Sequence, residues 1–157
     1  MIDTPRIVQT TKQLIAYIPL NVPAAEVRNV MGPGVMEVMK VVAAQSLAPT
    51  GAWFTHHRQR PGARFDFSIC VPVPASVTPS GRVLNGELPA TTVARTVYQG
   101  PYEGLGGAWA EFLAWVTAHG HTPRPDLWEC YVHGPESGAD PVAWRTELNQ
   151  PLEKPSR

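Results

Sequence analysis

The segment Leu127–His133, which reads LWECYVH, places one carboxylate among aromatic and branched side chains. Because side chains alternate between the two faces of a strand, Glu129 shares a face with Tyr131, and Trp128 shares the other face with Cys130. A solvated charge on an outer face is the ordinary interpretation of such an acid. The neighbouring ring favours another: Glu129 in an aromatic pocket, as counter-charge of an organic cation or, with a raised pKa, as a general acid or base.

Most of the other aromatic residues are expected in the core, but Tyr102 is an exception. It follows Gly100 and Pro101 at the predicted start of a helix, where a side chain can overhang a groove. Trp109 lies further along the same helix and could line the same space. These two aromatic residues are therefore candidates for the surroundings of Glu129.

Metal, nucleotide and nucleophile motifs are absent from the sequence. None of the five histidines has a cysteine or a second carboxylate at ligand spacing, so no metal site is expected. The sequence contains no P-loop, no GxSxG elbow and no GxGxxG, and no cofactor is expected. Cys70 and Cys130 lie in strand-like segments, which favours buried free thiols.

The composition argues against polyanionic partners. The 157 residues carry 13 Lys and Arg against 13 Asp and Glu, so the charge that drives binding to nucleic acid or to anionic membranes is missing. Apolar runs are too short to span a bilayer, and the start lacks the order of a signal peptide. We therefore expect one cytoplasmic domain without direct nucleic-acid or membrane contacts. The sequence makes no prediction of oligomeric state.

The first half of the chain predicts one long strand, helical segments and two further strands. Asn21 is the expected N-cap of a short helix that Gly32-Pro33-Gly34 breaks, and a second helix follows with an apolar stripe at helical spacing. The predicted strands are 7–18, 52–56 and 64–71, the predicted helices are 23–31 and 33–46, and the stripe is Val35, Val38, Met39 and Val42.

The second half repeats this order after a polar linker over 75–88. Matching residues lie about 75 to 78 positions apart. The predicted elements are strand 91–98, the helix of Leu105, Trp109, Phe112, Leu113 and Val116, and strands 127–133 and 142–148; the matched pairs are Ala16 with Ala94, Trp53 with Trp128, Phe67 with Trp144 and Pro74 with Pro151. In this alignment Phe54 corresponds to Glu129. The alignment in the first half can shift by one residue, so it does not decide between Trp53 and Phe54 at this position.

The predicted fold is therefore an α+β domain of two βαββ repeats related by a pseudo-twofold axis. Repeat one covers about residues 6–74, the linker 75–88, and repeat two 89–152. We expect a mostly antiparallel sheet with the helices on one face. A groove between the repeats would be the natural ligand site.

The segment from Val93 to Tyr102, the helix with Trp109, and residues 127–132 followed by Gly134-Pro135 resemble the GyrI-like small-molecule-binding domain. This domain is also the effector-binding half of AraC- and MerR-type multidrug regulators. The resemblance covers Arg6 to Leu152. It implies a central cleft with Glu129 as the acid that neutralises hydrophobic cations. The candidate ligand-binding residues are then Trp53, Phe54, Phe67, Tyr102, Trp109, Glu129 and Tyr131.

Unlike the regulators, this sequence shows no helix-turn-helix before the domain, so autonomous transcriptional control is not expected. The first hypothesis is capture of a hydrophobic, cationic or planar compound. The second, which the resemblance suggests, is hydrolysis of cyclopropane-bearing toxins, with Glu129 activating water and Tyr131 or Tyr102 positioning the substrate. The third is a protein-interaction domain such as a topoisomerase inhibitor, which ranks last because the chain has no acidic run.

Overall fold

The computed structural model describes residues 2–135, 138 and 140–154. These residues form eight strands and two α-helices in two compact units. The N-terminal unit is Thr11–Ala90, and the C-terminal unit is Met1–Thr10 with Thr91–Arg157. The strand pairs within each unit are antiparallel, and the chain has the α+β class predicted from the sequence.

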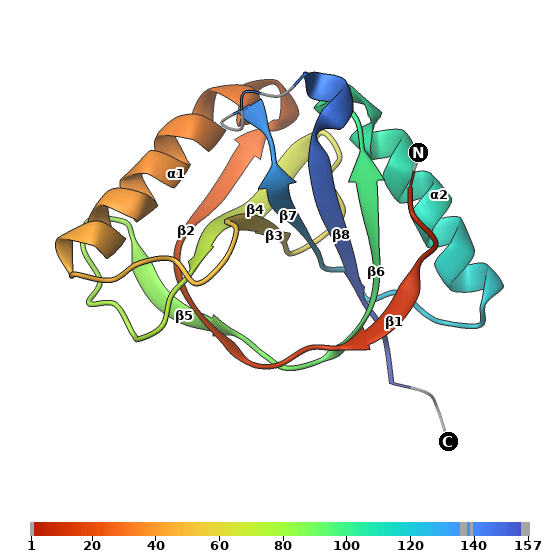
Figure 1. The fold of residues 1–157 in the computed structure, drawn as a ribbon, viewed down its shortest axis with the longest axis horizontal. Coiled ribbons are helices and arrows are strands. Elements are labelled where there is room, and N and C mark those ends of the chain that lie inside the picture. Colours follow the sequence, from red (N-terminus) through yellow and green to blue (C-terminus); the bar gives the residue numbers. More distant parts are fainter. Residues whose placement is uncertain (1, 136–137, 139, 155–157) are drawn as a thin grey trace. The chain divides into compact units, whose positions relative to one another are not determined.

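The N-terminal unit is a four-stranded sheet with one helix packed on it. Its strands lie in the order β3-β4-β2-β5. Helix α1 lies against β2 and β4 (Figure 1). Val38 and Val42 of this helix are buried in one core with Ile18 and Ile69. The elements are β2 (Gln13–Pro23), a 3-10 turn (Ala24–Glu26), α1 (Val27–Ala44), β3 (Phe54–His57), β4 (Arg64–Pro72) and β5 (Leu84–Leu88).

The C-terminal unit is also a four-stranded sheet with one helix packed on it, but one of its strands, β1, comes from the start of the chain. Its strands lie in the order β1-β6-β8-β7. Helix α2 covers the face on which Phe112 and Val116 are buried with Ala94 and Leu148. The elements are β1 (Arg6–Gln9), β6 (Thr92–Gln99), a 3-10 turn (Tyr102–Gly104), α2 (Leu105–Ala118), β7 (Leu127–His133), a 3-10 turn (Pro141–Ala143) and β8 (Arg145–Pro151).

Three predicted segments are corrected by the structure. The strand predicted over 7–18 is two strands, because β1 pairs with β6 whereas β2 pairs with β4 and β5. The predicted linker 75–88 contains β5. The strand predicted over 142–148 begins later, since a 3-10 turn occupies Pro141–Ala143 and β8 follows it.

The predicted helix break at Pro33 is wrong, because α1 continues through it. Proline lacks the N–H that would bond the carbonyl of Asn29, but the apolar stripe extends on both sides and packs into one core. The predicted N-cap Asn21 lies in β2, and the helix begins at Val27 after the 3-10 turn. Tertiary packing therefore outweighs the local signals for a break.

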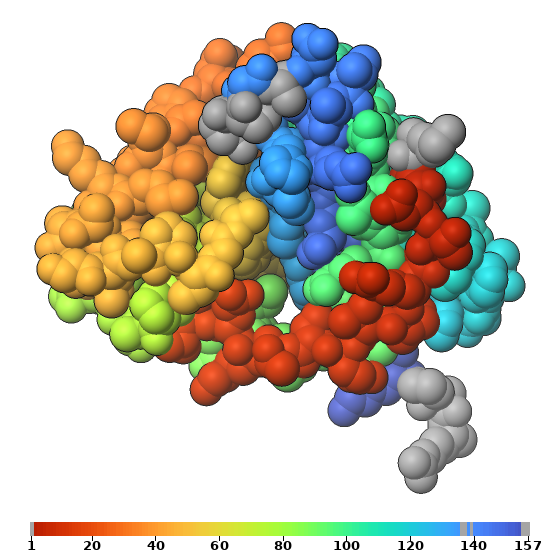
Figure 2. Space-filling model, in the orientation of Figure 1, coloured from red at the N-terminus to blue at the C-terminus, as the bar shows by residue number. Residues whose placement is uncertain are grey.

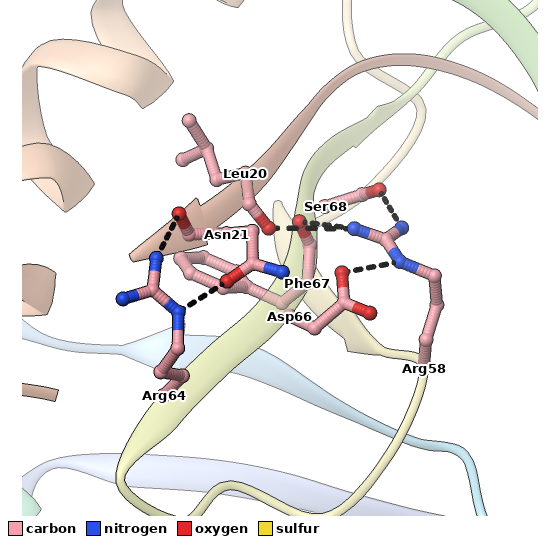
Figure 3. Close-up of polar contacts among 7 residues, drawn as sticks. All are labelled: Leu20, Asn21, Arg58, Arg64, Asp66, Phe67 and Ser68. Atoms are coloured by element: carbon pink, nitrogen blue, oxygen red, sulfur yellow. Dashed lines mark hydrogen bonds and ion pairs between the residues drawn. The ribbon is translucent and has the colours of Figure 1, made fainter. Parts of the chain in front are cut away.

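Two arginines on one face of the sheet connect neighbouring strands (Figure 3). Arg58, which follows β3, binds β4, and Arg64 of β4 binds β2. The Arg58 guanidinium donates to Asp66 at 2.7 Å, to Ser68 Oγ at 2.9 Å and to the Phe67 carbonyl at 2.9 Å. Arg64 donates to the side chain of Asn21 at 2.9 Å. These bonds hold the end of β3 in a fixed position relative to β4.

The outer side of α1 forms part of the molecular surface, seen in orange in Figure 2. Met36 on this helix is 71% exposed. Among the residues that the structure describes, no helix combines the length and the apolar character needed to cross a membrane.

Two glycines in α1 provide a test of the helix–sheet packing. Gly34 is buried, and an added Cβ would collide with Cδ1 of Ile69, whereas Gly32 is exposed with nothing within 4 Å of an added Cβ. We expect Gly34→Val to lower the free energy of unfolding by about 1–3 kcal/mol through overpacking. Gly32→Val should be neutral or slightly stabilising, because valine has the better helix propensity. Urea denaturation checks this, and equal effects at both positions would contradict the close approach.

Candidate functional site

Glu129 lies on the face of the C-terminal sheet that α2 covers. It pairs with Leu148 of β8, and paired residues of antiparallel strands project from the same face. Leu148 is fully buried in the core under α2. Glu129 itself is only 9% exposed, so the solvated-charge interpretation of this acid does not hold.

Two uncharged donors bind the Glu129 carboxylate, one at each oxygen. The indole N–H of Trp109 donates to Oε2 at 2.6 Å, and the hydroxyl of Tyr131 donates to Oε1 at 2.7 Å. Trp109 comes from α2, where its ring packs against Phe112 at 5.6 Å between centroids. Tyr131 comes from β7, two residues after the acid on the same face. The site is therefore assembled only when α2 packs on the sheet.

Burial and hydrogen bonding act in opposite directions on the pKa of Glu129. Burial is the larger effect and raises the pKa, while the bonds from Tyr131 and Trp109 lower it. Within residues 2–135, 138 and 140–154, no ion pair neutralises this carboxylate. The group can therefore bind a cation or exchange a proton.

A row of aromatic rings continues from Tyr131. The Tyr102 ring contacts the Tyr131 ring edge to face at 5.9 Å between centroids, and it contacts the Trp144 ring at 4.8 Å with a tilt of 43°. Tyr102 and Trp144 are both half-buried. Sequence reasoning did not include Trp144 in the site, because most aromatic residues outside the Glu129 face were expected in the core. Its pairing with Phe67 in the repeat was the only sequence signal.

The position of Tyr102 depends on the turn between β6 and α2. Gly100 has a φ of +146°, a conformation that favours glycine, and its N–H donates to the Trp144 carbonyl at 2.9 Å. The Tyr98 hydroxyl donates to the Pro101 carbonyl at 2.8 Å. A Cβ at Gly104 would collide with that hydroxyl. The two glycines and Tyr98 thus fix where the 3-10 turn presents Tyr102.

The opposite face of β7 carries a different set of groups. Trp128 is buried there, and Cys130 is half-buried next to Glu147, which pairs with Arg95 at 3.4 Å. Burial raises the pKa of the Cys130 thiol, so this sulfur is a poor nucleophile. The predicted division of faces therefore holds from Leu127 to Tyr131. The pairing register then shifts, and Val132 and His133 are exposed.

The structure brings together four of the seven candidates, all in the C-terminal unit: Tyr102, Trp109, Glu129 and Tyr131. The other three lie in the N-terminal unit. Phe67 is fully buried and stacks on His57 at 5.2 Å, and Trp53 packs partly buried against the core under α1. Phe54 pairs with Cys70 and therefore projects from the other face of that sheet than Phe67 does. Phe54 and Phe67 are not brought together.

Comparison with known proteins provides a family match. The sequence model of the family described as "GyrI-like small molecule binding domain" matches residues 3–152. Among curated proteins no relative matches the chain. The fold is similar to the EcmrR C-terminal domain, with a TM-score of 0.85, 23% identity, and coverage of 96% of this chain and 98% of that chain. In an EcmrR–DNA complex, the chain spans 57% of the EcmrR chain.

Two other similar structures share the fold at lower identity. One is described as a hydrolase from Listeria innocua, with 10% identity, a TM-score of 0.68, and coverage of 95% of this chain and 91% of that chain. Another is SAV2435 bound to tetraphenylphosphonium, with 10% identity, a TM-score of 0.63, and coverage of 96% and 94%.

The buried acid predicts an unusual dependence of stability on pH. Because the folded-state pKa of Glu129 is raised from 4.5, the folded protein holds a proton that the unfolded chain has lost, and its stability falls as pH rises through that interval. In Glu129→Gln the uncharged amide can accept from the Trp109 N–H and donate to the Tyr131 hydroxyl, so both contacts remain without the charge. We expect this variant to be more stable than the parent protein at about pH 8, with the difference shrinking towards pH 4.5. Urea denaturation across this range checks it; a constant difference would contradict the raised pKa.

Proposed function

The chain belongs to the GyrI-like small-molecule-binding domain family, and we propose that it binds a hydrophobic, cationic or planar small molecule, with Glu129 as the counter-charge of a ligand cation. This proposal rests on one observation above the others. A carboxylate that is 9% exposed has two uncharged hydrogen-bond donors and, among the described residues, no cationic side chain as a partner. A ligand cation would supply the missing charge.

The donors orient the carboxylate but do not neutralise it. Hydrogen bonds from Trp109 and Tyr131 stabilise the ionised form, yet burial dominates and raises the pKa. A cation placed next to Glu129 would return this pKa towards its ordinary range, because an opposite charge favours the ionised form. Binding is therefore coupled to ionisation of the acid. This coupling favours cationic over neutral ligands of the same shape.

The aromatic row provides the second part of ligand recognition. Tyr131, Tyr102 and Trp144 succeed one another at centroid distances of 5.9 and 4.8 Å. Ring faces attract organic cations, and each such contact contributes up to about 2 kcal/mol when desolvated. Delocalised cations suit such a site because they are weakly hydrated. The tetraphenylphosphonium bound to SAV2435, a protein of the same fold, is a compound of this kind.

Substitution of Glu129 tests this proposal directly. We expect Glu129→Gln to weaken the binding of rhodamine 6G and of tetraphenylphosphonium by at least about tenfold, since a desolvated charge loses its partner. Fluorescence anisotropy and calorimetry measure the two affinities. Glu111→Gln is the matched control, because it removes the same charge from an exposed position on α2. Equal affinities in the two variants would remove Glu129 from the site.

Hydrolysis is a second candidate function, favoured by the raised pKa of Glu129. In its ionised form, a carboxylate whose pKa is raised is a stronger base and can accept a proton from water, while a neighbouring tyrosine hydroxyl orients an electrophile. In a cyclopropane-bearing toxin, the water oxygen would bond to a ring carbon. The ring-bond electrons would pass into the conjugated carbonyl system, which takes up the proton. Tyr131 and Tyr102 are the positioning candidates.

Turnover separates the two candidate functions. If the protein is a hydrolase, catalytic amounts of it should convert an excess of a cyclopropanoid to the product that is heavier by one water, as followed by mass spectrometry. Glu129→Gln should abolish this conversion, whereas Glu111→Gln should leave it unchanged. Capture of one equivalent of intact compound would support binding alone.

A further inference from the structure

The face of the C-terminal sheet that α2 does not cover carries two arginines opposite each other. Arg6 of β1 pairs with Arg95 of β6, and paired residues of antiparallel strands project from the same face with Cβ atoms about 5 Å apart. Arg95 follows Ala94, which is buried in the core under α2. Because side chains alternate along a strand, both arginines point away from α2. They therefore lie on the face opposite to Glu129, within the same unit.

Arg95 uses one of its three guanidinium nitrogens for contacts with the described residues. Its Nε–H donates to Asn149 Oδ1 at 2.7 Å and lies 3.4 Å from Glu147 Oε1. Asn149 Nδ2 donates to the same carboxylate oxygen at 3.2 Å. The two terminal nitrogens of Arg95 make no hydrogen bond to any residue that the structure describes. The side chain is 22% exposed, so solvent reaches it.

The charges of this patch do not balance. Arg6 is exposed, and it has no ion pair within residues 2–135, 138 and 140–154. Glu147 is the one acidic residue on this face of the four strands, all of which the structure describes in full. Cys130 adds no negative charge, because burial raises the pKa of its thiol. Two opposed guanidinium groups therefore share one carboxylate, and like charges directly opposite each other are destabilising.

A third arginine shares this face but lies at a distance from the pair. Arg145 is two residues before Glu147 on β8, and it pairs with Gln99. Gln99 is four residues beyond Arg95 along β6, which corresponds to about 13 Å of strand. Arg145 therefore adds to the positive potential of the face without joining the two opposed guanidinium groups.

Apolar side chains flank the arginine pair. Val93 and Val97 lie two residues before and after Arg95 and so share its face, and Val8 of β1 pairs with Val93. Val93 is fully buried, whereas Val8 and Val97 are only half-buried. Accessible apolar surface therefore adjoins the uncompensated charge.

We propose that Arg6 and Arg95 form a site for a small carboxylate with an apolar body, such as an aromatic acid. The planar fork of a guanidinium matches a carboxylate with two parallel hydrogen bonds, and one negative charge compensates the excess. The apolar body would contact Val8 and Val97. The site is formed by the C-terminal unit alone, and it does not rest on the function proposed for Glu129.

Benzoate and benzamide test this site, because they have the same shape and differ in charge. In a ¹⁵N-labelled protein at constant low ionic strength, we expect benzoate to shift the Arg95 Nε–H resonance saturably, while benzamide leaves it nearly unchanged. Arg6→Gln removes one charge from an edge strand and leaves the Arg95–Glu147 pair intact, so the affinity for benzoate should fall about threefold. Arg95→Lys keeps the charge without the fork, and we expect a loss of about tenfold.

Two control variants make the outcomes distinct. Arg28→Gln removes the same charge from an exposed position on α1 and should leave the benzoate affinity unchanged. Equal losses in Arg6→Gln and Arg28→Gln would overturn the proposal in favour of a general charge effect, and so would an Arg95 resonance that responds equally to benzamide or not at all. Glu129→Gln should bind benzoate as the parent protein does, even if the function proposed for Glu129 fails. A loss in this variant would show that benzoate binds elsewhere.

Discussion

The C-terminal unit is organised around the burial of one carboxylate. Removing an ionised group from water costs several kcal/mol unless partners compensate for the lost hydration. Glu129 has two such partners, and they come from different elements: Trp109 from α2 and Tyr131 from β7. Neither bond exists until α2 packs on the sheet. Formation of the site and formation of the core under α2 are therefore one event.

The same arrangement is a poor solution if stability is the only requirement. An apolar residue could fill the position without the cost of desolvation, and an uncharged amide could accept from the Trp109 N–H while donating to the Tyr131 hydroxyl. The acid instead sits beside a row of rings whose order depends on Gly100, Gly104 and the Tyr98 hydroxyl. A costly group supported by a fixed aromatic framework is typical of a binding site, where function is gained at the expense of stability.

Where sequence patterns depend on local alternation, they predict the structure well. Alternation predicted β4 and the shared face of Glu129 and Tyr131 on β7, and β-branched content predicted β6. The helical stripe placed Trp109 on α2. The patterns fail where non-local packing decides. The segment 7–18 contains no proline or glycine, so the sequence lacks a strong signal where the chain changes from one strand partner to another. Pro33 remains helical because the core continues on both sides of it.

The least predictable feature is the register within the first repeat, because a slip of one residue exchanges the two faces of a strand. Thr55 pairs with Ile69, and this register places His57, not Phe54, on the helix-covered face. Composition alone does not reveal the register. The prediction that Phe54 corresponds to Glu129 is thus wrong by one residue. The backbone plan of the units is shared, so their difference in chemistry comes from side chains alone. At matched registers one unit buries a carboxylate and the other buries a neutral imidazole. Two buried acids would instead have doubled the cost of desolvation.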